Sequence, residues 1–242
     1  MKMLLPSLMC AMVAVNASAQ QAPDIPRFST MKPAAKPPPE WKDAPLSAFK
    51  KHTDYSLVTE DGVVVLRAVA HGSASGLAFT TEFDPHKFPM LSWRWKVAKG
   101  IPDANNADPT KEDSPLRVIV HFDGDTSKLS AKDTRASSTA KFASGRPLPY
   151  AMLMYIWGNQ VAIDSVTTSN HYSRIKMLAV SVDDKGVGKW QSYTRNLVDD
   201  YKRAFGEDPG NVISIDLLTD TDNTNGDAEA FYGDISVGPA KP

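Results

Sequence analysis

Apolar and polar residues alternate along several short segments of the chain, the pattern of strands with one buried face. In segments 91–97 (LSWRWKV) and 116–122 (LRVIVHF), nearly every second residue is apolar. Segment 62–70 (GVVVLRAVA) is apolar almost throughout, which is typical of a strand in the middle of a sheet. Further strands are predicted at 151–158, 175–182, 212–219 and 228–237.

Two segments have a helical pattern instead. Apolar residues recur every fourth position from Leu197 to Phe205, Asn196 precedes them as an N-cap, and Gly206 follows them as a stop. The polar segment 126–144 predicts a weaker helix or an ordered loop. Short strands and Gly/Asn/Asp turns outnumber helices, so the chain is expected to be all-β with minor helices.

The first residues are typical of a secretory signal. Met1-Lys2 is followed by an apolar run, and Ala17-Ser18-Ala19 supplies the small residues of a cleavage site after Ala19. The run is too short to span about 30 Å of hydrocarbon, so it does not predict a membrane anchor. A periplasmic or secreted protein is therefore expected, and no segment is expected to span a membrane.

The remaining chain divides into three parts by composition. Residues 20–45 are rich in proline and predict an extended linker. Residues 46–238 hold all the predicted strands and form one domain, and residues 239–242 are a tail. The domain is predicted to be a two-sheet, jelly-roll-like β-sandwich resembling carbohydrate-binding-module sandwiches, with a closed barrel as the alternative.

Charge and cysteine content exclude several kinds of partner and chemistry. The 27 basic and 28 acidic residues nearly balance, and no basic stripe is present, so a nucleic-acid partner is excluded and an anionic membrane surface is disfavoured. The single cysteine, Cys10, lies within the signal. Beyond the signal the chain has neither disulfides nor a thiol for catalysis.

Motifs of nucleophilic and zinc catalysis are absent from the sequence. Segment 72–76 (GSASG) has Ala74 where a nucleophile elbow needs serine. The five histidines form neither H-x-H nor H-E-x-x-H, the spacings that place two zinc ligands on one face. The residues therefore assign no catalytic group by motif.

The loop LLTDTDNTNGDAEAFYGDI (217–235) has the oxygen-rich composition that Ca²⁺ prefers. It is not an EF-hand, because Asn225 replaces the required glycine and Phe231 stands where the bidentate glutamate belongs. By analogy with sugar-binding sandwiches, a structural Ca²⁺ held by Asp220, Asp222 and Asp234 is one interpretation. The other is an ordinary turn, in which Asp and Asn bond their own backbone.

Strand phase gathers a second set of polar residues. If the last two strands pair, Asp216 and Asp234 lie close together beside Tyr232, and the outward residues of other strands complete a polar groove. The six residues of this expected groove are Arg94, Arg117, His121, Asp216, Tyr232 and Asp234. Such a groove could bind a saccharide or a carboxylate, although the solvent face of any antiparallel sheet is also polar.

Six motifs occur in an order that resembles the bacterial domain-of-unknown-function family numbered 3047. They are GSASGL, FPMLSWRWKV, LRVIVHFDGD, YIWGN, RNLVDDYKRAFGEDP and TDTDNTNGDAEAFYGDI, and the resemblance covers roughly residues 45–238. It implies an exported, sandwich-like domain of Gram-negative bacteria with no assigned activity, cofactor or catalytic residue. The chain departs from the family pattern at Ser114-Pro115 and at Tyr193, where glutamate is usual.

Three functions are compatible with these observations. The leading hypothesis is a non-catalytic domain that binds a glycan or another polar small molecule in the groove, with a structural Ca²⁺ nearby. The second is a polysaccharide hydrolase that uses Asp216 and Asp234 as an acid/base pair. The third is an envelope scaffold positioned by the segment 20–45.

Overall fold

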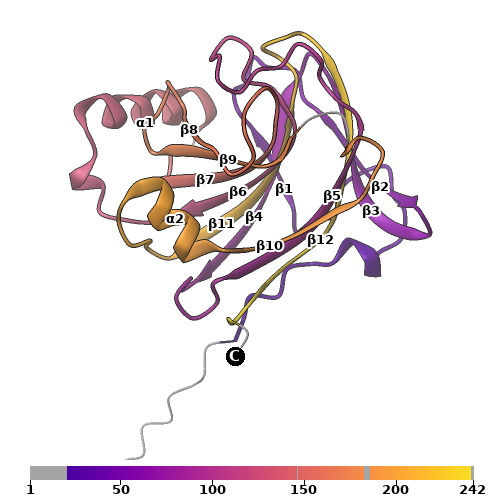
Figure 1. The fold of residues 1–242 in the computed structure, drawn as a ribbon, viewed down its shortest axis with the longest axis horizontal. Helices are drawn as coiled ribbons and strands as arrows, with labels where there is room; N and C mark the ends of the chain where they lie inside the picture. Colours follow the sequence, from indigo (N-terminus) through magenta and orange to yellow (C-terminus); the bar gives the residue numbers. More distant parts are fainter. Residues whose placement is uncertain (1–20, 146, 183–185, 241–242) are drawn as a thin grey trace, which may run out of the picture.

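The computed structural model describes residues 21–145, 147–182 and 186–240, which form two β-sheets packed face to face (Figure 1). The predicted signal lies outside the described residues. The seven-stranded sheet has the order β1 (Lys42–Pro45), β4 (Ala74–Phe83), β11 (Val212–Asp220), β6 (Ser114–Phe122), β7 (Ala151–Gly158), β9 (Ile175–Val182) and β8 (Val166–Thr168). The five-stranded sheet has the order β10 (Gln191–Asn196), β5 (Met90–Lys99), β12 (Asp227–Gly238), β3 (Val63–His71) and β2 (Asp54–Glu60). The predicted two-sheet sandwich is confirmed.

Neighbouring strands pair antiparallel throughout, except for β7 and β9. The helices are α1 (Ala131–Ser144) and α2 (Leu197–Phe205), with 3-10 turns η1 (Phe28–Thr30) and η2 (Thr126–Lys128). Among the described residues, none of the helices has the length and apolar character that crossing a bilayer requires.

The core between the sheets follows the predicted alternation. Trp93 and Trp95 of β5 face Tyr155 of β7, and the ring centroids of Trp93 and Tyr155 lie 4.9 Å apart. All three are buried, so the large aromatic area on the inner faces stabilises the sandwich by its removal from water. The buried hydroxyl of Tyr155 donates a hydrogen bond of 3.0 Å to Asp200 of α2 and so retains a polar partner.

Helix α2 begins and ends as the sequence predicts. The side chain of Asn196 accepts hydrogen bonds from the amides of Val198 and Asp199, and Gly206 ends the helix in the left-handed conformation at φ 73°. Arg195 binds Asp200 through two nitrogen atoms, which fixes the first turn of the helix to the end of β10.

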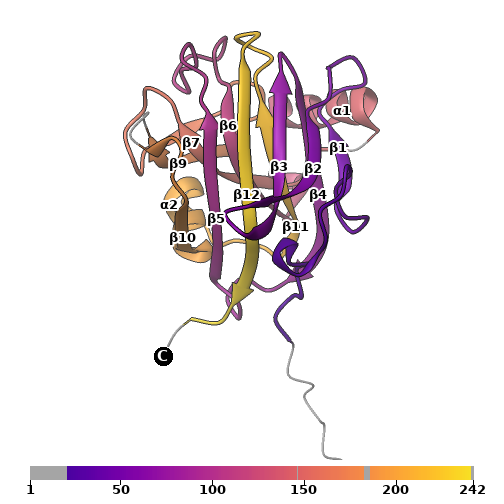
Figure 2. The same ribbon diagram turned by 90° about the vertical axis from the view of Figure 1, so that its right-hand side faces the viewer.

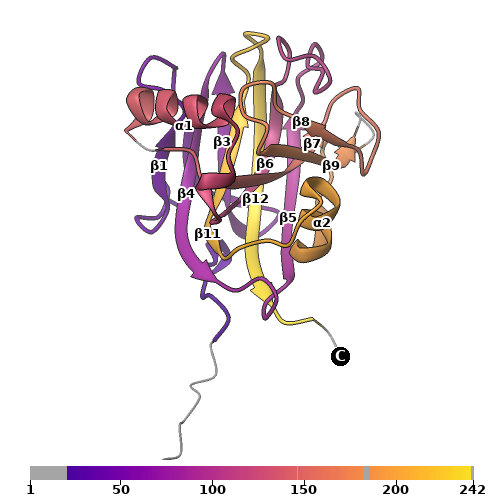
Figure 3. The same ribbon diagram turned by 90° about the vertical axis from the view of Figure 1, so that its left-hand side faces the viewer.

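Helix α1 lies across part of the outer face of the seven-stranded sheet, as Figure 3 shows. Figure 2 shows the opposite side, where the five-stranded sheet carries no comparable helix. The outward residues of β6, β7 and β9 are largely apolar and form a second core cluster, which is separate from the one between the sheets. Helix α1 packs on this cluster through Ala136 and has few large apolar residues of its own.

The proline-rich segment predicted as an extended linker is instead packed on the sandwich. Residues 42–45 form strand β1, which pairs with β4, and Ala34 forms a bridge with Leu57. Phe28 and Trp41 are buried, and the Trp41 ring lies 5.6 Å from the rings of both Phe28 and Phe79. Proline composition gave the wrong prediction because two aromatic side chains anchor the segment.

Five strands were not predicted from the sequence: β1, β2, β4, β8 and β10. Three of these, β1, β8 and β10, are short strands at or beside sheet edges, where alternation extends over few residues. Gly72 and Ser73 form the turn that precedes β4, and the strand begins at Ala74, within the segment GSASG. A side chain at Gly76 would come within 2.5 Å of the Leu217 carbonyl oxygen, so glycine is needed for close pairing with β11.

The packing of the N-terminal segment predicts a large effect of Trp41→Ala. Loss of this buried ring should reduce the free energy of unfolding by about 3–5 kcal/mol, as truncation of core aromatics does. Urea denaturation followed by fluorescence measures the change. Phe49→Ala, which removes an exposed ring, is the control and should change stability by less than about 0.5 kcal/mol. Equal stability of Trp41→Ala and the parent would show that the segment is a dispensable linker.

Candidate functional site

A cavity of about 680 Å³ lies on the outer face of the seven-stranded sheet. Outward side chains of β4, β11, β6 and β7 form its floor, together with Ile175 of β9. Ala140 of α1, residues 147–149, and residues of β1 and the segment after it form its walls. A large concave space on a rigid sheet is the leading place to look for a ligand site.

One end of the cavity is polar. His121 of β6 and Asp216 of β11 project from neighbouring strands, and His121 Nε2 lies 3.1 Å from Asp216 Oδ2. This is ion-pair distance, but Nε2 is buried and makes no hydrogen bond to the described residues. Ser214 donates to Asp216 Oδ1, and Thr80 and Asp43 border the same space. This end is rich in acceptors and includes a ring nitrogen that makes no hydrogen bond within the described part of the protein.

The arrangement of serine, aspartate and histidine is not that of a nucleophile with its base. The Ser214 hydroxyl is bonded to the carboxylate of Asp216 and to the carbonyl oxygen of Phe79. Among the described residues, no hydrogen bond joins Ser214 to His121. Activation of a serine requires the imidazole against the hydroxyl, with the carboxylate behind it. The geometry therefore favours binding over acyl transfer.

The other end of the cavity is apolar and adaptable. Met152 and Met154 project from β7, beside Ile119 of β6 and Ile175 of β9, and Leu148 closes the wall. Methionine side chains adjust their shape to irregular ligands more easily than branched side chains do. The described lining contains no Phe, Tyr, Trp, Lys or Arg. It thus lacks the flat aromatic ring on which a sugar commonly stacks.

The structure does not bring the six residues of the expected groove together. Only His121 and Asp216 share the cavity. Arg94 belongs to the other sheet, where its guanidinium lies 4.6 Å from the centre of the Trp190 ring. Arg117 does project from the cavity-bearing face of β6, but it is buried in a bidentate pair with Asp220.

The predicted phase of the last strand was wrong because β12 contains a bulge. Tyr232 pairs with Trp95 and Ile235 with Trp93, so the two residues Gly233 and Asp234 stand opposite the single residue Arg94. Both Tyr232 and Ile235 consequently point into the core, and the Tyr232 hydroxyl donates to the Leu218 carbonyl oxygen at 2.8 Å.

Asp216 and Asp234 are not an acid/base pair. Strand β11 pairs with β4 and β6, whereas β12 pairs with β3 and β5, so the two carboxylates belong to different sheets. Asp234 accepts hydrogen bonds from the amide and the hydroxyl of Ser29, at 3.0 and 2.5 Å. It therefore anchors the N-terminal segment, and the hydrolase built on this pair is excluded.

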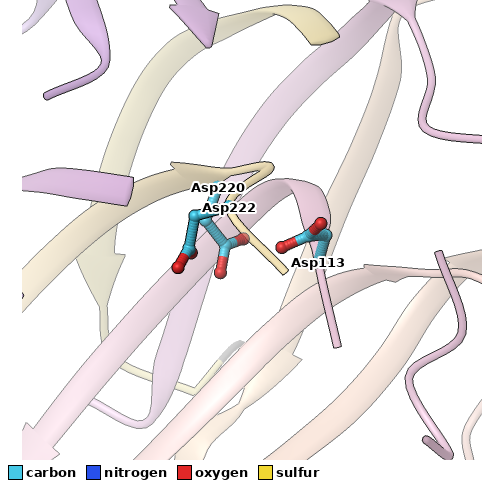
Figure 4. A group of neighbouring side chains, drawn as sticks. All are labelled: Asp113, Asp220 and Asp222. Carbon is cyan, nitrogen blue, oxygen red and sulfur yellow. The ribbon is translucent and has the colours of Figure 1, made fainter. Parts of the chain in front are cut away.

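The aspartate-rich loop gathers a different set of carboxylates from the one predicted. Asp220 and Asp222 at the end of β11 meet Asp113, which immediately precedes β6 (Figure 4). One oxygen from each of the three lies within 4.8 Å of the others. Asp234 is not in this group and is removed from the candidate metal ligands.

Most oxygen atoms of these carboxylates already have partners. Asp113 accepts hydrogen bonds from the amides of Asn223 and Thr224, which is the turn chemistry that the sequence also allowed. Asp222 Oδ2 lies 2.6 Å from Lys50 Nζ, whereas Asp222 Oδ1 is buried without a hydrogen-bond partner. This one orphaned oxygen is the place where a cation fits best.

Burial raises the pKa of Asp220 to about 6, although the adjacent guanidinium of Arg117 favours the ionised form. The carboxylate of Asp113 acts in the same direction as burial. Burying the ionised form of Asp220 therefore costs free energy, and a positive charge at the cluster would lower that cost.

Sequence reasoning missed the walls of the cavity. Asp43 and Ala140 lie on segments assigned to a linker and to a weak polar helix, and His52 precedes a strand that was not predicted. The methionines of β7 did carry a signal, because their row alternates with the buried Tyr155 and Trp157.

A sequence profile of the family described as "Protein of unknown function (DUF3047)" matches residues 39–236. A search of curated proteins finds no match. Solved structures with similar folds include the family 30 carbohydrate-binding module of a cellulosomal cellulase of Clostridium thermocellum (11% identity, 89% of this chain and 98% of that one, TM-score 0.40). Another is the carbohydrate recognition domain of Emp47p (13% identity, 89% and 94%, TM-score 0.42). A third is an exo-beta-agarase (11% identity, 86% and 24%, TM-score 0.43). At these identities the likeness concerns the fold alone.

The raised pKa of Asp220 predicts a specific pH dependence. The folded form holds a proton to about pH 6 and the unfolded form only to about pH 4, so this group's contribution to stability is lost as the pH rises through that window. The free energy of unfolding of the parent minus that of Asp220→Asn should therefore fall between about pH 4 and about pH 7. Urea denaturation in chelator measures this difference.

Asp108→Asn is the control for this experiment. Hydrogen bonds from the amide and the hydroxyl of Thr110 lower the pKa of Asp108, so its contribution is lost only as the pH falls below about 4. The same difference for Asp108 should stay constant between about pH 5 and about pH 7. A constant difference for Asp220 as well would contradict the assigned burial effect.

Proposed function

The chain belongs to the DUF3047 family of proteins of unknown function, and we propose that it is a non-catalytic binding domain for a small amphipathic ligand. The ligand occupies the cavity over β4, β11, β6 and β7. Its apolar body lies on Met152, Met154 and Ile119, and its polar end reaches Asp216 and His121. The observation that carries this proposal is the combination in one space of a methionine-rich floor with the His121–Asp216 pair, whose buried Nε2 makes no hydrogen bond in the part of the chain that the structure describes.

The charges around the cavity limit which chemical groups the polar end of the ligand can carry. Asp43 and Asp216 line it, and no described lysine or arginine does. An amino or hydroxyl group can donate to the carboxylates, whereas an anionic group would meet like charge in a partly dehydrated space. The proposed ligand therefore carries donors at its polar end. The glycan ligand predicted from the sequence stays a candidate for the same cavity through its hydroxyl groups.

Location outside the cytoplasm forms part of the proposal. It rests on the sequence signal at residues 1–19, which lies outside the described residues. The absence of cysteine after Cys10 means that the fold of the exported domain does not depend on the redox state of its compartment.

The structural Ca²⁺ expected from the loop also remains a proposal, with a changed set of ligands. Asp113, Asp220 and Asp222 would hold it, and the buried Asp222 Oδ1 supports this assignment. Four carboxylates, those three and Glu112, lie near two cations, Arg117 and Lys50. The excess negative charge favours a cation at the cluster.

Binding of three probes tests the ligand proposal. Dodecylamine, dodecanoate and cellohexaose, each below any micelle concentration, are titrated against the protein by calorimetry. Dodecylamine should bind at least about tenfold more tightly than dodecanoate, because the carboxylate probe is repelled by Asp216. Asp216→Asn should reduce this preference, and Asp103→Asn, which alters an exposed carboxylate outside the cavity, should not.

Met152→Trp fills the apolar end and should abolish binding while the unfolding transition is retained. Equal affinity for both charged probes would refute the assigned polar end. Binding of cellohexaose alone would replace the amphipathic ligand with a saccharide, and no binding of any probe would overturn the proposal.

Calcium is tested by thermal unfolding. Ca²⁺ at about 100 times its dissociation constant should stabilise the protein by about 2.7 kcal/mol, and EDTA should reverse the shift. The shift should be smaller at about pH 5 than at about pH 7, because protonated Asp220 competes with the ion. Asp222→Asn should abolish it, whereas Asp234→Asn should lower the melting temperature but keep the shift. An unchanged melting temperature in the parent would exclude the ion.

A further inference from the structure

Exposed large hydrophobic side chains are concentrated around the mouth of the cavity. Four are present among the described residues: Leu46, Phe49, Phe142 and Ile163. Leu46 lines the cavity, and Phe49 belongs to the same segment, between β1 and β2. Phe142 belongs to α1, whose Ala140 lines the opposite wall. Three of the four therefore lie on the two segments that border the cavity.

The exposure of the two phenylalanines is nearly complete, at 94% for Phe49 and 95% for Phe142. A single exposed apolar residue is ordinary on a protein surface. In α1, however, the small Ala136 and Ala140 face the sheet and the cavity while the one large apolar residue points to solvent. Phe142 would have been buried if it stood at a position of α1 that faces the sheet, as Ala136 does.

Basic residues accompany both rings in the sequence. Phe49 is followed by Lys50 and Lys51, and Lys141 precedes Phe142. On α1, Lys132 and Arg135 are also exposed, whereas its only acidic residue, Asp133, is buried and bonded to Ser130 and Ser173. Lys50 is paired with Asp222, and Lys51 donates a hydrogen bond to the carbonyl oxygen of His71 at the end of β3, so the remaining positive charge comes mainly from α1. The surface around the mouth is thus both aromatic and cationic.

We propose that this rim, made of the segment 46–51 and α1, docks the domain on an anionic lipid membrane. In Figures 2 and 3, α1 lies beside β1 and the segment that follows it, and residues of both segments line the same cavity. Phenylalanine side chains enter the boundary between headgroups and acyl chains, while lysine and arginine bind the negatively charged headgroups. Docked in this way, the mouth of the cavity faces the lipid. Membrane docking does not depend on the proposed function. Entry of an amphiphile from the membrane into the cavity does depend on it.

This inference reverses the expectation drawn from charge along the sequence. Lys51, Lys132, Arg135 and Lys141 are scattered and form no basic block, so a membrane surface was disfavoured. The fold brings α1 to the edge strand β1, and that arrangement puts two segments that carry these charges, α1 and the segment after β1, on the border of one cavity.

Flotation with lipid vesicles tests the proposal on the full chain without its predicted signal. Vesicles of phosphatidylcholine with phosphatidylglycerol are compared with vesicles of phosphatidylcholine alone. The parent should float with the anionic vesicles and lose most of this binding in high salt. Phe49→Ser combined with Phe142→Ser should weaken partitioning at least about tenfold. Lys141→Glu should weaken binding to anionic vesicles only.

Ile163→Ser is the matched control, because it removes an exposed apolar side chain that lies outside the cavity-bordering segments, and it should float as the parent does. The double serine variant should still bind dodecylamine, since neither phenylalanine lines the cavity. Membrane docking and ligand binding therefore fail separately. A parent that floats with neither kind of vesicle, or a double variant that floats like the parent, overturns the proposal.

Discussion

An apolar outer face on the seven-stranded sheet is the constraint on which the rest of this structure depends. Ile119, Met152, Met154, Ile156 and Met177 all point away from the core between the sheets, and such a face must be removed from water. Helix α1 covers it but presents alanines, which are too small to fill the space above the methionines. The cavity therefore exists because large side chains form its floor and only small side chains of α1 lie above them. Protein interiors are generally close-packed, so this incomplete filling marks the face as different in purpose.

Strand phase was largely predictable because it is local. The alternation in β6 correctly assigned His121 to the outer face, that in β7 correctly separated the row of Tyr155 from the row of Met152, and the caps of α2 were predicted correctly from Asn196 and Gly206. Sheet membership was not predictable, because hydrogen-bonding partners are chosen by the whole fold. The expected groove required β11 and β12, which are adjacent in sequence, to pair, yet they belong to opposite sheets. One bulge at Gly233 then inverted the faces of the residues before it, which no periodic pattern could reveal. A side chain at Gly233 would come within 2.4 Å of the Arg94 stem, so the bulge itself depends on that glycine.

The N-terminal segment and the acidic loop show how composition misleads when a few residues supply the energy. Proline content predicted a linker at residues 20–45, but Phe28 and Trp41 bury enough apolar area to hold the segment on the sandwich, and Asp234 fixes it through Ser29. Asp234 was a candidate calcium ligand by analogy with sugar-binding sandwiches, in one of two interpretations of the loop. The third carboxylate of the cluster is instead Asp113, which lies about a hundred residues away in the chain. The pairing of β6 with β11 brings it to the loop.

Arg117 joins the acidic cluster to the cavity. Its guanidinium is held by both oxygens of Asp220 on one side, and on the other its Nη1 lies 3.3 Å from the sulfur of Met177 and 3.9 Å from that of Met154. Because Met154 lines the cavity, the position of the buried ion pair sets the position of part of the floor. A buried charge pair of this kind adds little net stability but strongly restricts the geometry around it. Burying Asp220 costs free energy, which is reflected in its raised pKa. The ion pair that contains Asp220 also sets the shape of the apolar end of the cavity. The loop that first suggested a metal and the face that holds the cavity are two ends of one hydrogen-bonded unit.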